Sequence, residues 1–276
     1  MCPNCRAFIT SSDKVCPYCD APVGARAIDR RSPADLLGGL IPHARFNTVV
    51  ILLINTGLFL AMMVFSAKMG WGGGMDMDGR VLFAFGAKYR EAILEGQWWR
   101  FITAGFLHGG IWHIVMNSYG LFIVGSHAEQ EYGADRYILF YIVSTITGFL
   151  ASFYWTSALS VGASAGIFGL IGVMIAFGMR DKSSYGRAVQ SQYLMWAGLN
   201  FVLAMFGGLA IDNAAHVGGL AGGFALAWVA GTPGYSRSTE MVWKIASIAA
   251  LIVTVASFGL WFRWLLANMD AIAAMR

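Results

Sequence analysis

The chain has 276 residues, of which 57% are hydrophobic and only 12% carry a charged side chain, and its formal net charge is +4. A soluble domain of this length carries about a quarter of its residues as charged groups. So apolar a composition excludes a water-soluble globular fold and indicates a chain that needs lipid as its solvent.

The four cysteines lie at the start of the chain as two Cys-x-x-Cys pairs, Cys2 with Cys5 and Cys16 with Cys19. Two such pairs at this separation are typical of four thiolates that hold one structural zinc ion. Disulfides and a redox motif are the alternatives. We expect no signal peptide before the cysteines, and no βαβ pattern surrounds them. We therefore predict a zinc ribbon over residues 1–24 that stays in the reducing cytosol.

Residues 25–45 contain four arginines and two prolines, which indicates a basic linker. The stretch Phe46–Phe65 has no charged residue and is long enough for one membrane-spanning helix of about 20 residues. Residues 66–100 are rich in glycine and hold Trp71, Trp98 and Trp99, which favours a loop in the headgroup region.

Six further spans are predicted after this loop. Their ranges are about Phe101–Ser126, two spans within the uncharged stretch Tyr137–Met179 (broken near Thr156–Ser160), Ala188–Leu209, Asp212 to just before Pro233, and Ile245–Leu266. The sequence therefore predicts seven spans in total.

Basic residues near span ends predict the orientation. Those expected on the side of the N-terminus, after the linker arginines, are Arg180, Lys182, Arg187, Arg237 and Lys244. The short loops near 156–161 and 208–211, on the opposite side, have none. We therefore expect a cytosolic N-terminus and an external C-terminus.

Polar side chains occur at membrane depth in three places, and such residues are candidates for function. The second span contains His108, His113 and Asn117. The fourth opens with Gly-Ala-Ser-Ala-Gly around Ser164, and the sixth opens with a segment that ends at His216. All three spans have these residues toward the outer face, so we expect the three groups to lie at similar depth.

A serine and a histidine at one depth can form a nucleophile with its general base. His113 and Asn117 are four residues apart on one helix face, where their side chains can donate to a developing oxyanion. Small residues allow the fourth and sixth spans to approach closely, and the relevant ones are Gly162, Gly166, Gly169, Gly219 and Gly223.

Each feature alone has an ordinary explanation. A serine in such a helix usually bonds to a carbonyl one turn back, and an intramembrane histidine often lines an ion or proton path. Spaced glycines mostly serve helix packing. Ser164, His216 and the glycines are much less often found together by chance than any one of them alone.

Several segments resemble motifs of the rhomboid family of intramembrane serine proteases. They are Gly-Ala-Ser-Ala-Gly-Ile-Phe-Gly at 162–169, Ala-His-Val-Gly-Gly-Leu-Ala-Gly-Gly at 215–223, His113-Ile-Val-Met-Asn117, Trp99-Arg100, and Glu129 with Gly133. The motifs follow in the family's order and cover about residues 46–231.

The resemblance implies an all-α membrane protein with a six-helix rhomboid core at 46–231. A zinc ribbon precedes this core, and residues 232–276 add a seventh transmembrane helix. It implies that Ser164 is the nucleophile and His216 the general base, with no third, acidic member. His113, Asn117, His108 and Gly162 support the oxyanion side.

Three further residues are interpreted beside this resemblance. Asp212 lies one turn before His216, and we expect it to cap the start of its helix rather than act as a catalytic acid. Phe168 occupies a position where an aromatic ring packs against the histidine in relatives. Ala165 replaces the glycine that follows the serine in many members, and we expect the oxyanion geometry to survive this change.

The expected function is cleavage of single-span membrane proteins near the outer boundary of a lipid bilayer, with no cofactor for catalysis and zinc only in the ribbon. We expect a bacterial plasma (inner) membrane, a cytosolic partner for the ribbon, and no nucleic acid. Two alternatives remain: a catalytically inactive rhomboid-like protein that binds membrane clients, and a transporter that depends on His108, His113 and His216.

Overall fold

The computed structural model describes residues 2, 4–5, 7–9, 13, 15–21, 23, 45–71, 75–206, 211–232 and 237–275. Residues 25–44 of the predicted basic linker, including three of its arginines, lie outside the described residues. The described part of the chain is helical and forms no β-strand; isolated bridges join Asp76 to Gly110 and Lys88 to Ser160.

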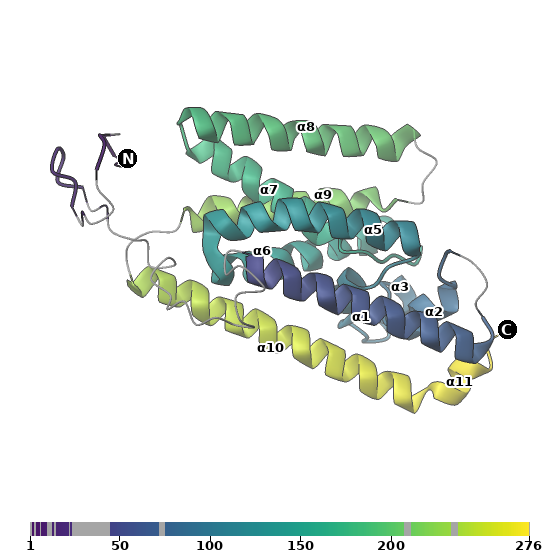
Figure 1. The fold of residues 1–276 in the computed structure, drawn as a ribbon. Coiled ribbons are helices and arrows are strands. Elements are labelled where there is room, and N and C mark those ends of the chain that lie inside the picture. Colours follow the sequence, from purple (N-terminus) through teal and green to yellow (C-terminus); the bar gives the residue numbers. More distant parts are fainter. Residues whose placement is uncertain are drawn as a thin grey trace.

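Helices follow one another along the chain and form a bundle (Figure 1). Their bounds are α1 Phe46–Met69, α2 Gly79–Ala84, α3 Arg90–Leu94, α4 Arg100–Thr103, the 3-10 turn η3 Ala104–Phe106, α5 Ile111–Gly120, the π-helical turn η4 Leu121–Gly125, α6 Ser126–Trp155, α7 Ser164–Arg180, α8 Ser184–Phe206, α9 Asn213–Ala230, α10 Arg237–Ala267 and α11 Met269–Ala273.

Three helical stretches of the described chain are long and apolar enough to cross a membrane: Phe46–Met69, Ile111–Trp155 and Ser238–Ala267. The second has 45 residues, about twice the length of one crossing, and Gly133 breaks its helical geometry with a φ of 74°. An all-α membrane protein is therefore confirmed, whereas the number of seven crossings stays a prediction.

The second span was predicted as one helix over Phe101–Ser126, and this is wrong for its first part. The segment begins with the short turns α4 and η3, and α5 starts only at Ile111. Gly110 pairs with Asp76 in an antiparallel bridge, in which the carbonyl of Gly109 accepts from Met77 and the N–H of Ile111 donates to Met75, so these two groups are not available to a helix that runs through residue 110. His108 consequently lies before the helix rather than within it.

The helix α7 forms the centre of the bundle. Every residue from Ala165 to Gly178 is buried, and the helix contacts α6, α8 and α9. Figure 1 shows α8 along one edge of the bundle and α10 along the opposite edge. A helix that is buried on all sides is surrounded by protein rather than lipid. Small residues on such a helix allow its neighbours to pack closely against it.

Glycines set the distance between α7 and α9. A Cβ added to Gly219 of α9 would overlap the backbone carbonyl of Ala165, and one added to Gly223 would overlap the carbonyl of Gly169. The two backbones are therefore in direct contact, as the glycine spacing predicts. Gly172 contacts the carbonyl of Leu220 in the same way.

The helix α1 begins with a cap that comes from another helix. Its own N-cap residue, Arg45, makes no side-chain cap. The carboxylate of Glu129 on α6 accepts hydrogen bonds from the backbone N–H groups of Asn47 and Thr48 at 2.9 Å and from both of their side chains. Glu129 thus satisfies backbone donors that a helix start leaves unpaired.

The loop before α4 is held by a buried arginine. Arg100 is fully buried, and its guanidinium donates to the carbonyls of Phe83 and Ala87 at 2.9 and 2.8 Å. It also lies over the rings of Phe83, Trp99 and Trp264, with 5.0 Å to the last. Cation–π contacts strengthen when the cation is removed from water. Since Trp264 belongs to α10, Arg100 connects this loop to α10.

The other end of α10 is fixed to α6. Arg136 is 1% exposed and forms an ion pair with Glu240 of α10, and its guanidinium lies 5.0 Å from the ring of Trp243. Toward the end of α10, the indole of Trp261 donates to the carbonyl of Ala84 at 2.8 Å. The helix is therefore attached to the core by polar contacts at both ends.

The glycine contact between α7 and α9 leads to a first prediction. Gly219→Ala should lower the stability of the protein by about 1–3 kcal/mol, because the new methyl group overlaps a backbone carbonyl that cannot move alone. Thermal unfolding in detergent measures this. Gly198→Ala on α8 is the matched control, since nothing lies within 4 Å of its added Cβ. Equal melting temperatures for both variants would contradict the close approach.

Candidate active site and cysteine cluster

Ser164 is the first residue of α7, and the glycine two positions before it shapes the approach. Gly162 has a φ of 137°, which other residues rarely adopt, and its N–H donates to the carbonyl of Ala104 at 3.0 Å. A Cβ at Gly162 would lie 2.8 Å from His113 Nε2 and 3.4 Å from Ser164 Oγ. Both side chains therefore flank the bare Cα of Gly162.

His216 lies in the first turn of α9, opposite Ser164. Its Nε2 is 2.9 Å from Ser164 Oγ, a hydrogen-bonding distance between residues 52 positions apart. The ring of Phe168 stacks on the imidazole with 4.0 Å between centroids and 13° between planes. The predicted packing of Phe168 against the histidine is confirmed.

Asp212 caps α9, as the sequence predicts. Its carboxylate accepts from the N–H of Ala215 at 3.0 Å, and its other oxygen accepts from Ser152. Within the described part of the chain, Nδ1 of His216 is buried without a hydrogen-bond partner. Asp212 therefore does not contact the imidazole as a third member of a triad would.

His113 is oriented by a backbone contact. The N–H of Gly109 donates to His113 Nδ1 at 3.1 Å, so Nδ1 is an acceptor. The neutral imidazole must then carry its proton on Nε2, the atom beside Gly162. His113 thus presents a donor toward the space in front of Ser164.

Asn117 and His108 lie near His113 in different ways. Asn117 is buried on α5, and its Nδ2 donates to the carbonyl of His113 at 2.9 Å, which leaves the second N–H of the amide for another acceptor. His108 is fully buried, and its ring lies edge-on to that of His113 with 5.3 Å between centroids. Gly162, His113 and His216 therefore lie beside Ser164, while Asn117 and His108 both contact His113.

Lys88 is a site-positioning residue that the sequence did not identify. It is fully buried, and its ammonium donates to the carbonyls of Thr156 and Ala158 at 2.7 and 3.0 Å. Burial lowers the pKa of this ammonium. Its backbone also pairs with Ser160, four residues before Ser164. Lys88 therefore ties the loop after α2 to the segment that leads into α7.

The arrangement around Ser164 has the parts of an acyl-transfer site. A hydroxyl contacts an imidazole nitrogen, and a second imidazole with a fixed tautomer presents a proton to the same space. Such an arrangement can transfer the hydroxyl proton during attack and stabilise the resulting oxyanion.

The four N-terminal cysteines form a second cluster. Their sulfur atoms lie within 4.8 Å of one another, with 3.6 Å between Cys2 and Cys19 and between Cys5 and Cys16. All four are free thiols. A tetrahedral zinc ion with Zn–S distances of about 2.3 Å separates its sulfurs by about 3.8 Å, so the donor set fits zinc.

Backbone hydrogen bonds at this cluster favour the thiolate form of Cys2 and Cys19. The N–H groups of Asn4 and Cys5 donate to Cys2 Sγ at 3.4 and 3.5 Å. A backbone hydrogen bond from Ala21 and a side-chain hydrogen bond from Asn4 lower the pKa of the Cys19 thiol to about 6, whereas the side chain of Cys19 raises the pKa of Cys5 and burial raises that of Cys16. Since zinc binds the deprotonated thiol, these contacts suit a metal site. They support the predicted zinc ribbon.

Comparison with known proteins shows one matching family and several relatives. The model of the Rhomboid domain matches residues 95–233. Rhomboid protease GluP of Bacillus subtilis is 33% identical over 205 residues, which are 74% of this chain and 40% of that protein. Rhomboid-like protease 1 of Toxoplasma gondii is 29% identical over 234 residues, 78% of each chain.

The similarity extends to plants. RHOMBOID-like protein 5 of Arabidopsis thaliana is 36% identical over 149 residues, which are 52% of this chain. The chain spans less than half the length of this protein and of GluP, at 48% and 40%. The similarity to these relatives therefore covers only part of each.

The cysteine cluster leads to the second prediction. We expect the purified protein to contain about one zinc ion per chain, measured by plasma mass spectrometry, because the four sulfurs have tetrahedral spacing. Cys16→Ser removes a buried ligand and should lose most of the zinc. Tyr18→Phe, an exposed neighbour, is the control and should keep it. Zinc-free wild type with intact thiols would contradict the site.

Proposed function

The chain belongs to the rhomboid family, and from this we propose that it is an intramembrane serine endopeptidase with Ser164 as nucleophile and His216 as general base. The observation that carries the proposal is the 2.9 Å between Ser164 Oγ and His216 Nε2. These atoms come from two different helices, whose backbones touch through glycine, so the contact does not follow from local sequence alone.

The proposed reaction begins with proton transfer. His216 Nε2 takes the proton of Ser164 Oγ as this oxygen attacks the carbonyl carbon of the scissile peptide bond. The carbonyl oxygen becomes an oxyanion. His216 then gives its proton to the leaving nitrogen, and an acyl-enzyme remains on Ser164. Water, activated by His216, hydrolyses this ester and restores the hydroxyl.

The oxyanion has two side-chain donors in this proposal. His113 supplies its Nε2–H, because Nδ1 already accepts from Gly109. Asn117 supplies the amide N–H that is not bonded to the carbonyl of His113. Gly162 leaves room between His113 and Ser164, where any side chain would collide with the imidazole. Preorganised donors of this kind are often the largest catalytic term.

The imidazole is oriented without a carboxylate. Phe168 stacks on its face, and Asp212 is engaged with Ala215 and Ser152. We propose that stacking takes over the orienting role that an acid has in a triad. This assigns a dyad rather than a triad to the chain.

The substrates of the proposed enzyme are single-span membrane proteins. An intact substrate helix hides its carbonyls in internal hydrogen bonds, so it must unwind before Ser164 can attack it. We propose a core over 46–231 with its site open to the outer face, the loop 66–100 in the interface, and a cytosolic ribbon. The enzyme should prefer substrates that have small residues and an unstable helix near the cleaved bond.

The third prediction concerns the dyad. Ser164→Ala should reduce cleavage of a membrane-embedded substrate by at least about 10⁴-fold, because no other group supplies the nucleophile. A fluorophosphonate probe should label wild type but neither Ser164→Ala nor His216→Ala. Ser157→Ala, an exposed serine between α6 and α7, is the control and should keep full labelling. Folded wild type that takes no label and cleaves no substrate would favour a client-binding protein instead.

The fourth prediction separates binding from oxyanion stabilisation. Asn117→Ala should lower kcat by about 10²-fold or more with little change in KM, because the donor acts mainly on the transition state. His113→Ala should behave alike. Both variants should still react with the probe, only more slowly, since Ser164 and His216 are intact. A rise in KM with unchanged kcat would assign these residues to substrate binding.

A further inference from the structure

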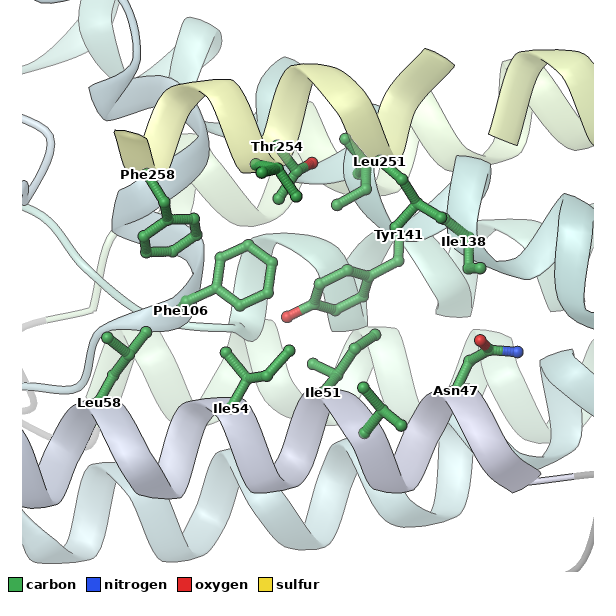
Figure 2. Close-up of a pocket in the computed structure, with 13 residues that line it drawn as sticks. Asn47, Ile51, Ile54, Leu58, Phe106, Ile138, Tyr141, Leu251, Thr254 and Phe258 are labelled. Atoms are coloured by element: carbon green, nitrogen blue, oxygen red, sulfur yellow. The ribbon is translucent and has the colours of Figure 1, made fainter. Parts of the chain in front are cut away.

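We propose that a cavity bounded by α1, α6 and α10 binds one acyl chain of a phospholipid from the surrounding bilayer. The cavity has a volume of 330 Å³. Figure 2 shows Ile51 and Ile54 of α1 facing Leu251 and Phe258 of α10, with Tyr141 of α6 between them. The lining includes none of the candidate catalytic residues and has no part in the chemistry above.

The cavity is closed on the inside and open toward lipid. Ile51 and Tyr141 form its buried side, at 8% and 0% exposure. Ile54, Leu251 and Val255 border its opening, at 42%, 43% and 71% exposure. Because α1 and α10 both have the length and hydropathy of membrane spans, the opening faces hydrocarbon rather than water.

The polar atoms of the lining are already engaged. Thr254 Oγ1 donates to the carbonyl of Ala250 at 2.8 Å, and Asn47 Nδ2 donates to Glu129 at 2.7 Å. The hydroxyl of Tyr141 makes a long contact of 3.4 Å with the carbonyl of Gly105. Water enters a cavity where several polar partners await it, and this lining offers few. An apolar occupant therefore fits best.

The volume distinguishes a single chain from a helix. A methylene group occupies a volume similar to that of a water molecule, about 30 Å³, so the cavity holds roughly ten methylene groups. The lining on α1 runs from Asn47 to Leu58, about 16 Å of helix. A substrate helix of that length, about 10 Å wide, needs several times this volume. One acyl chain fits the cavity, and a transmembrane helix does not.

Cations at one end indicate how the lipid lies. Lys244, Leu251 and Phe258 are seven residues apart and share one face of α10. Exposed Lys244 is thus about 10 Å beyond Leu251, past the end of the cavity where Asn47 lies. Exposed Arg45 precedes α1 at that same end. We infer that the phosphate lies near these cations and the chain extends toward Phe258.

The test uses a phosphatidylcholine with a photoreactive diazirine near the end of one acyl chain, in nanodiscs of unlabelled phosphatidylcholine without substrate. After irradiation, mass spectrometry locates the labelled residues. We expect labels to concentrate on Tyr141 and Phe258. Labels spread evenly over the outer faces of α1 and α10 would instead show ordinary bilayer contact and overturn the proposal.

A matched pair of double variants tests the cavity itself. Ile54→Trp with Leu251→Trp fills it and should reduce labelling of Tyr141 several-fold. Leu53→Trp with Val253→Trp adds the same bulk to exposed positions outside the lining and should not. Equal labelling in both double variants would overturn the proposal.

Lys244→Gln leaves the cavity intact and tests the proposed contact between Lys244 and the lipid phosphate. It therefore remains informative if the double variant Ile54→Trp with Leu251→Trp fails to fold. It should lower labelling by the phospholipid but not by a photoreactive fatty alcohol, which has no phosphate. Labelling by the fatty alcohol alone in wild type would exclude a phospholipid as the occupant. Because no substrate is present, the Ser164→Ala variant gives the same readout, and failure of the protease proposal would leave this result unaffected.

Discussion

The structure depends on the direct backbone contact between α7 and α9. Ser164 begins α7 and His216 lies in the first turn of α9, so their separation is set by how closely the two helices approach. Gly219 and Gly223 allow carbonyls of α7 to touch the backbone of α9. In lipid no water-driven force holds helices together, so close packing of small residues supplies the adhesion. The same glycines that stabilise the pair therefore define the geometry of the candidate site.

Around this pair, buried polar groups fix segments that apolar packing alone would leave free to shift. Glu129 holds the start of α1, and Lys88 holds the segment before Ser164. Arg100 joins the loop after α2 to α10. Each of these charged groups meets carbonyls, N–H groups or aromatic faces, which is what a low-dielectric surrounding demands. The polar contacts position the site, while the chemistry stays with a few residues beside Ser164.

Much of the fold and of the candidate site was predictable because it rests on local pattern. Uncharged stretches gave the helices, and counting spans put Ser164 and His216 at one depth. The cap by Asp212 follows from its spacing one turn before His216, whereas the stack of Phe168 was expected only from the family resemblance. Two features had no local signature: the pairing of Gly110 with Asp76, which delays α5, and the contacts of Lys88. Both contacts join residues that are far apart in the chain, and nothing in the sequence around either residue indicates its partner.

The attachment of α10 at both ends has a consequence for how the protein comes apart. Arg136 and Arg100 lie buried in the core, yet each meets aromatic side chains of α10, and Glu240 neutralises the first. Detaching α10 would leave two guanidinium groups facing hydrocarbon with part of their surroundings gone, which is costly. The last long helix, α10, is therefore an integral part of the bundle. We therefore expect α10 and the preceding helices to unfold as one cooperative unit.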